Sequence, residues 1–71
     1  MIQYVVKKGS KFLNFYDYDC GNNSLFEAGT PHNASRYSEE QAEKIAVELE
    51  GRVVAVAIEV KNNVRRWTEF K

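Results

Sequence analysis

The chain has 71 residues, and its ten basic and ten acidic side chains leave no net formal charge at pH 7. This length predicts one domain spanning residues 1–71, and a hydrophobic content of 44% argues against a disordered chain. The single cysteine, Cys20, excludes an intrachain disulfide and a zinc site built from several thiolates.

Cysteine usage and the N-terminal sequence both bear on the cellular compartment. Small secreted domains are rich in disulfides, so one cysteine fits a reducing environment. The N-terminal sequence MIQYVVKKG places its lysines after a short apolar run, the reverse of the order in a signal peptide. No apolar stretch approaches the roughly 20 residues that a membrane span requires. These features predict a cytoplasmic protein without a membrane partner.

Two strands are expected at the start of the chain. Ile2, Tyr4 and Val6 alternate with more polar residues, which is the period of a β-strand. A turn at residues 8–10 then reverses the chain, and a second strand is expected from residue 11 onward. If that strand continues through Tyr18, then Phe12, Tyr16 and Tyr18 point to the same side of the sheet. Residues 24–27 are a candidate for a short third strand.

An amphipathic helix is expected from about residue 39 to residue 50. The sequence Ser38-Glu39-Glu40-Gln41 forms a capping box, and glutamates in the first turn suit the positive end of the helix dipole. An apolar stripe at helical spacing follows, formed by Ala42, Ile45, Ala46 and Leu49. Gly51 is the expected left-handed residue that ends the helix.

Residues 52–60 predict a central strand, because both of its faces are largely apolar. The face with the larger side chains is expected to pack against the helix; it comprises Val54, Val56, Ile58 and Val60. The shallow face with Ala55 and Ala57 is expected to be covered either by a second copy of the chain, as a homodimer, or by a terminal segment of the same chain. Asn62-Asn63 predicts a second hairpin turn before a final strand from residue 64 to residue 70.

These elements predict an α+β fold with the order β-β-(β)-α-β-β. One helix packs on one face of a small, mainly antiparallel sheet.

The stretch FLNFYDYDCGNN, residues 12–23, contains the residues most suggestive of a chemical site. Asp17 and Asp19 begin like a calcium-binding loop, but the obligatory glycine position falls on Asn22 and the final ligand position on Ala28. As an acid pair they have no third partner placed by the sequence, and a lone Cys20 with a lone His32 shows no oxyanion-binding device. We therefore predict no catalytic residue, no metal site and no cofactor.

Two surfaces remain as candidate binding sites. The acidic face of the helix is a candidate for binding a partner protein through Glu39, Glu40 and Glu43. The alternative is nucleic-acid binding by basic hairpins and neighbouring aromatic residues, through Lys7, Lys8, Lys11, Arg65, Arg66 and Trp67. A sequence pI of about 6.6 lacks the basic excess typical of nucleic-acid-binding domains.

Two segments of the chain resemble a known group of proteins. The sequence NASRYSEEQAEKIA at residues 33–46, with ELEGRVVAV at residues 48–56, is similar to small uncharacterised proteins of phages and prophages of Gram-positive bacteria. Those proteins also often begin with a YVVK-like strand and a Lys-Gly turn, as residues 4–9 do here. The resemblance covers about half of the chain. It implies a non-enzymatic accessory protein that binds a host protein in the host cytoplasm, as inhibitors of host defence or host enzymes do.

Overall fold

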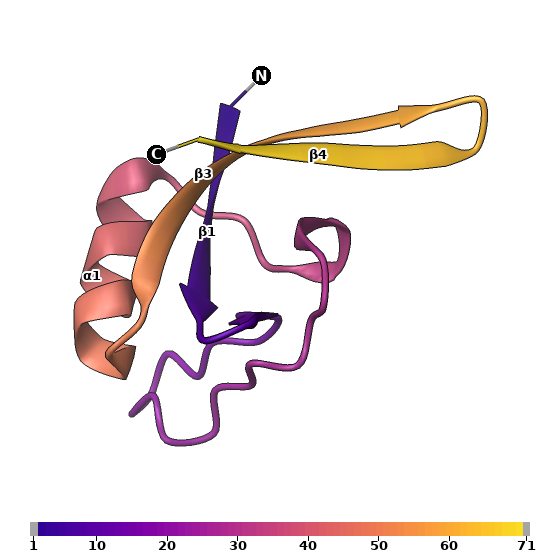
Figure 1. Cartoon of the computed structure of the whole chain (residues 1–71). Coiled ribbons are helices and arrows are strands. Elements are labelled where there is room, and N and C mark those ends of the chain that lie inside the picture. Colours follow the sequence, from indigo (N-terminus) through magenta and orange to yellow (C-terminus); the bar gives the residue numbers. More distant parts are fainter. Residues whose placement is uncertain (1, 71) are drawn as a thin grey trace.

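The computed structural model describes residues 2–70, which form a four-stranded antiparallel sheet with a helix on one face (Figure 1). The sheet has the order β2-β1-β3-β4. The elements are β1 (Ile2–Lys8), β2 (Lys11–Phe12), the 3-10 helix η1 (Pro31–Asn33), α1 (Glu39–Leu49), β3 (Arg52–Lys61) and β4 (Val64–Phe70). The predicted α+β class and its order of elements are confirmed.

The β3–β4 hairpin, at the C-terminal end of the chain, is the longest strand pairing of the sheet. Asn62 and Asn63 both adopt positive φ, 51° and 65°, which matches a two-residue turn of the type that suits the twist of a hairpin. Seven residue pairs follow the turn, from Lys61 with Val64 to Ala55 with Phe70. The tip of this hairpin extends away from the body of the domain as an arm (Figure 1).

The helix begins as its capping sequence predicts. The Ser38 hydroxyl accepts a hydrogen bond from the backbone N–H of Gln41 at 3.2 Å. The predicted C-terminal cap was wrong by one residue, because Glu50 takes the left-handed conformation, with φ 58° and ψ 33°. The N–H of Gly51 then bonds to the carbonyl of Ala46 at 2.8 Å, which closes the helix end.

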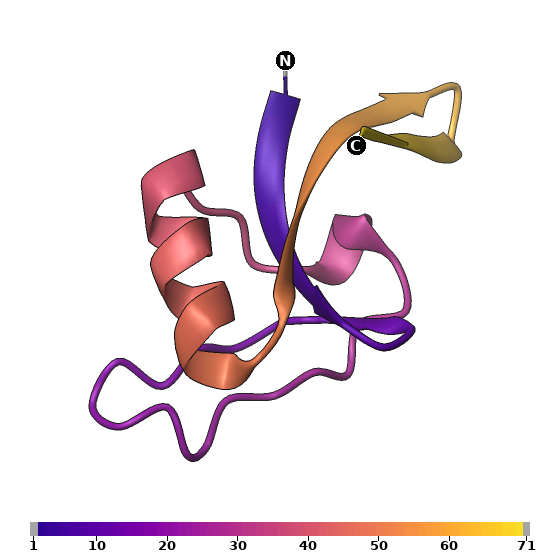
Figure 2. The same ribbon diagram turned by 60° about the vertical axis from the view of Figure 1, so that its left-hand side comes forward.

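The prediction that the larger side chains of β3 face the helix was also wrong. Val53 packs in the helix-side core, together with Tyr4 and Val6 of β1, whereas Val54 and Val56 lie in a second core on the opposite face. The second core is covered by Phe12 of β2 and by the segment between β2 and α1, whose Ala28 and Ala34 pack there. Figure 2 shows α1 and η1 on opposite sides of the central strands. The central part of the sheet, β1 and the first half of β3, is thus covered on both faces by its own chain, whereas β4 is exposed.

The Ala55 and Ala57 face is the face on which α1 lies, since these residues alternate in phase with Val53. The fully buried Ala42 and the buried Ala46 of α1 are small, which suits a close approach of helix and sheet. Most of this face is therefore covered by α1, and not by a second copy or a terminal segment as expected. A homodimer through it stays a prediction, with open surface remaining near Ile2, which is 52% exposed.

The second strand is much shorter than predicted. β2 ends at Phe12, and the chain continues as an irregular loop held by single bridges of Phe12 with Ala28 and of Phe15 with Leu25. The candidate third strand at residues 24–27 is reduced to that bridge at Leu25. Because the strand stops, the predicted common direction of Phe12 and Tyr16 fails: they pack in the two different cores.

Candidate functional site

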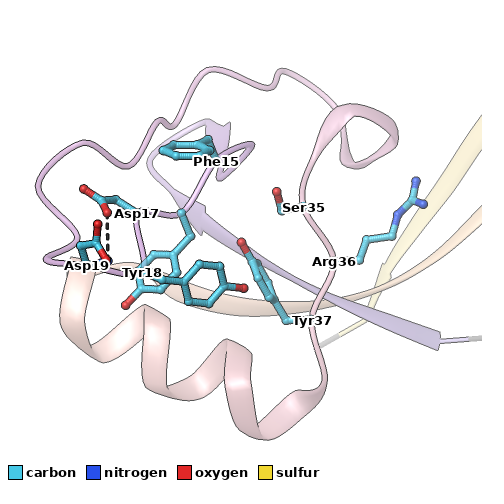
Figure 3. Close-up of a pocket in the computed structure, with 8 residues that line it drawn as sticks. Phe15, Asp17, Tyr18, Asp19, Ser35, Arg36 and Tyr37 are labelled. Carbon is cyan, nitrogen blue, oxygen red and sulfur yellow. Dashed lines mark hydrogen bonds between the residues drawn. The ribbon is translucent and has the colours of Figure 1, made fainter.

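An open hollow of about 540 Å³ lies between the loop after β2 and the segment before α1 (Figure 3). We call it the aromatic hollow. Its lining residues are Phe15, Tyr16, Asp17, Tyr18, Asp19, Ser35, Arg36 and Tyr37. Four of these eight side chains are aromatic, two are acidic and one, Arg36, is basic, so the hollow combines apolar faces with an excess of negative charge.

Backbone hydrogen bonds bring the two segments of the hollow together. The N–H of Ser35 donates to the carbonyl of Leu13 at 2.9 Å, and the N–H of Tyr37 donates to the carbonyl of Tyr4 at 2.9 Å. The Ser35 hydroxyl also donates to the carbonyl of Asn14 at 3.0 Å. Leu13 is itself fully buried, so the loop that carries the hollow is anchored in the helix-side core.

The aromatic rings form an inner and an outer set. Tyr16 and Tyr37 are half-buried and pack against the helix-side core. Phe15 and Tyr18 are exposed, with 50% and 73% of their surface open to water. The rings of Tyr16 and Tyr18 meet edge to face at 4.8 Å between centroids, so the outer ring is held against the inner one. Figure 3 shows the rings of Tyr18 and Tyr37 above α1.

The two aspartates of the hollow form part of a turn and do not form a free acid pair. The Asp17 carboxylate accepts a hydrogen bond from the backbone N–H of Asp19 at 2.9 Å, drawn as a dashed line in Figure 3. This bond is the main reason that the pKa of Asp17 is below its ordinary value, and a bond from Cys20 adds to the effect. Asp17 therefore stays ionised while it stabilises its own turn.

The C-terminal side of this turn, at Gly21, packs against the C-terminal end of α1. Gly21 is buried with φ 75°, and an added Cβ would lie 2.7 Å from the Glu48 carboxylate and 3.3 Å from Leu49. The Tyr16 hydroxyl donates a hydrogen bond to the same Glu48 carboxylate. This bond, with help from desolvation, raises the pKa of Tyr16 to about 12.

The tyrosine–glutamate bond predicts a pH dependence. Because the pKa of Tyr16 is raised above its usual value of 10, the bond stabilises the fold fully below pH 10 and less as the pH rises towards 12. A spectrophotometric titration at alkaline pH should show one tyrosine ionising near pH 12, and Tyr16→Phe should remove that step. A wild-type titration in which all tyrosines ionise together near pH 10 would contradict the bond.

Cys20 and His32 do not form a nucleophile and base. The Cys20 thiol lies 3.5 Å from the Asp17 carboxylate, within the turn. The His32 ring instead meets Trp67 edge to face at 5.7 Å and lies 3.5 Å from the carbonyl of Glu59. Within residues 2–70, no group of three or more His, Cys, Asp or Glu side chains is arranged to hold a metal ion.

The basic residues proposed for nucleic-acid binding do not gather on one patch. Lys7 pairs with Glu69 at 3.4 Å, and Lys8 donates to the carbonyl of Leu49 at 3.1 Å, so both take part in contacts of the fold. Lys7 lies opposite Arg52, whereas Arg65 lies opposite Val60. Arg52 and Val60 are eight positions apart along β3, or about 26 Å at the rise of a strand.

The other residues predicted for nucleic-acid binding are Lys11 on β2 and Arg66 and Trp67 on β4. Lys11 is exposed on β2, Arg66 pairs with Glu59 on the hairpin arm, and Trp67 contacts His32.

The acidic residues of α1 are exposed near its N-terminus. Glu39 raises the pKa of Tyr4, chiefly through its charge, and Glu40 forms an ion pair with Lys44 at 3.5 Å. Glu43 is also exposed. An i,i+4 pair on an open helix face contributes only a few tenths of a kcal/mol, so these contacts leave the acidic face accessible to water.

Sequence reasoning did not identify the aromatic hollow. It noted the aromatic residues 15–18 but expected a strand there, and it assigned no role to Ser35, Arg36 or Tyr37. The signal that could have found the hollow is Tyr37, an aromatic residue just before the capping Ser38. An apolar residue at that position commonly fixes how the preceding chain enters a helix.

Comparisons of the chain with protein-family models, with curated proteins and with solved structures find no match. Among residues 2–70, no helix has the length and apolar character needed to cross a membrane.

Proposed function

We propose that this protein is a non-enzymatic binding protein that associates stoichiometrically with a partner protein through the aromatic hollow. The observation that carries the proposal is the exposure of Phe15 and Tyr18, at 50% and 73%, on a loop anchored in the core. Exposed aromatic side chains that are already held in place lose little conformational freedom on binding. Aromatic residues of this kind supply much of the energy of protein interfaces.

The charge around the hollow favours a protein partner. Asp17 and Asp19 place negative charge at its rim, which repels the phosphates of a nucleic acid. Arg36 also lines the hollow, but its side chain points away from the aromatic rings (Figure 3) and donates to the carbonyl of His32 at 3.4 Å. Lysine or arginine side chains of a partner could pair with the aspartates and lie over the rings.

The resemblance to phage accessory proteins suggests the kind of partner. On that basis we propose a bacterial host protein, bound by inhibition or sequestration in the host cytoplasm. The hydrogen-bonded Asp17 carboxylate, engaged in its own turn, supports a binding role for this loop more than an acid–base one.

The hollow can be tested with a matched pair of variants. Tyr18→Ala removes an exposed ring of the hollow, and Val47→Ala removes an exposed apolar side chain of α1 that is 82% open to water. From host lysate, tagged wild-type protein and Val47→Ala should capture the same partner in a fixed ratio. Tyr18→Ala should weaken capture at least about tenfold, as expected for an interface aromatic residue.

Two further measurements separate the alternatives. Triple charge reversal of Glu39, Glu40 and Glu43 should leave capture of the partner intact if the hollow binds it. If this triple variant instead lost capture while Tyr18→Ala kept it, the binding site would be the acidic helix face. Salt-sensitive binding of labelled single-stranded DNA or RNA, lost on substitution of Lys11 and Arg65, would favour the nucleic-acid alternative.

A further inference from the structure

We propose that β4 is a self-complementary edge strand, through which two copies of this chain pair antiparallel to form one continuous sheet. This interface is distinct from the aromatic hollow and does not depend on the function proposed for it. Three features of β4 favour this pairing: its free edge, the direction of its backbone groups, and the order of its side chains.

β4 is the long open edge of the described sheet. The opposite side of the sheet is closed by the chain itself, because β2 covers the C-terminal part of β1 and Tyr37 forms a bridge to Tyr4. All seven residues of β4 are exposed, and no backbone bond from the loops reaches its outer side in residues 2–70. Exposed edges of this length are templates for further strand pairing unless the protein blocks them.

The backbone of β4 is oriented for such pairing. A two-residue turn makes Lys61 and Val64 a hydrogen-bonded pair, and such pairs then alternate along an antiparallel ladder. Val64, Arg66, Thr68 and Phe70 therefore direct their backbone groups towards β3. The N–H and C=O groups of Arg65, Trp67 and Glu69 point outward, where the structure gives them no strand partner.

The side chains of β4 fit a second β4 in one register. When two copies pair about a twofold axis at Trp67, all seven residues of each strand are matched. Arg65 of each copy then lies opposite Glu69 of the other copy. The twofold axis thus creates two cross-strand pairs of opposite charge. Both pairs are of the hydrogen-bonded kind, as is the central Trp67 pair, so the outward backbone groups are satisfied.

The same register covers the apolar side chains of the arm. Val64 lies opposite Phe70 of the second copy on the helix side of the sheet, and these residues are 49% and 43% exposed in the single chain. Trp67 is 40% exposed and meets its own copy across the axis on the other side. Shifting the axis to Arg65 would set two arginines against each other, so charge also selects the register.

Charge reversal tests this pairing directly. We expect wild-type protein to dimerise with rising concentration in sedimentation analysis, with a blue shift in the emission of Trp67, the only tryptophan. R65E alone and E69R alone each set like charges opposite each other, and each should raise the dimer dissociation constant at least about tenfold. An equimolar mixture of the two variants should recover association as a heterodimer, and R65E/E69R should recover the homodimer.

The controls keep the test decisive. Glu69 also pairs with Lys7 within the chain, so circular dichroism and thermal unfolding should first show that each variant is folded. Mixing cannot repair a folding defect, because each variant keeps its own substitution. Recovery of association in the mixture would therefore report on strand pairing. A wild-type protein that stays monomeric at millimolar concentration would overturn the proposal. So would a dimer that is insensitive to R65E but lost on Ala57→Glu, which would place the contact on the helix-side face.

Discussion

Replacing Leu13 by alanine should cost about 3–5 kcal/mol of unfolding free energy, the range found for fully buried leucines that leave a cavity. Leu13 has no exposed surface and is the largest fully buried side chain of the described residues. A chain of 71 residues is expected to have roughly 4–10 kcal/mol of stability in all, so this one change should remove much of it.

Urea denaturation followed by circular dichroism measures this loss. Leu25→Ala is the matched control, because Leu25 lies in the same loop but is 42% exposed, and it should change the unfolding free energy by less than about 1 kcal/mol. Equal effects of the two substitutions would mean that the loop is not anchored by Leu13. A partly unfolded Leu13→Ala protein should regain a cooperative transition at low temperature or in stabilising salt.

Leu13 matters because it links the fold to the aromatic hollow. Its side chain lies in the helix-side core, while its carbonyl accepts the bond from Ser35 that joins the two segments of the hollow. The preceding Phe12 packs in the other core. The chain at the end of β2 is therefore anchored in both cores within two residues, while Phe15 and Tyr18 further along the loop face solvent.

The elements predicted from sequence are those with a local signal. The helix was expected from about 39 to 50 and spans Glu39–Leu49, and the strand expected at 52–60 spans Arg52–Lys61. Capping by Ser38, helical spacing of apolar residues, and two asparagines that tolerate positive φ each act within a few residues. Such signals survive in the fold because no tertiary contact opposes them.

The errors concern contacts between distant parts of the chain. Both faces of β3 are apolar, so alternation alone could not say which face the helix would take. The choice depends on Phe12 of β2 and on Ala28 and Ala34 of the following segment, which cover Val54 and Val56. The aromatic hollow was missed for the same reason, since its two segments, residues 15–19 and 35–37, are distant in the sequence and are brought together by contacts such as the bond of Ser35 to Leu13.

The hollow and the β4 edge lie on different parts of the molecule, so one can be occupied without using the residues of the other. A dimer through β4 would carry two aromatic hollows. A partner with two binding sites at a suitable spacing would then be bound more tightly than by one copy, because the second contact forms within one complex. R65E should therefore weaken binding to such a partner without changing the affinity of a single hollow.

The second large effect is expected at the junction of the helix and β3. Gly51 is needed there for space: its φ lies outside the positive range, but an added Cβ would lie 3.0 Å from the carbonyl oxygen of Lys7 and 3.0 Å from a methyl group of Val6. The backbone of β1 cannot move aside without disturbing its pairing of Lys7 with Arg52. Gly51→Ala should therefore cost about 1–3 kcal/mol, as overpacking does in a core.

Gly29→Ala is the control for this substitution. Gly29 has no heavy atom within 4 Å of an added Cβ, and its φ also lies outside the positive range. Its replacement should leave stability unchanged or raise it slightly, because alanine restricts the unfolded chain. In urea titrations the two variants should thus differ in sign or by at least about 1 kcal/mol. If Gly51→Ala were as stable as Gly29→Ala, the helix end would not approach β1 as closely as the structure shows.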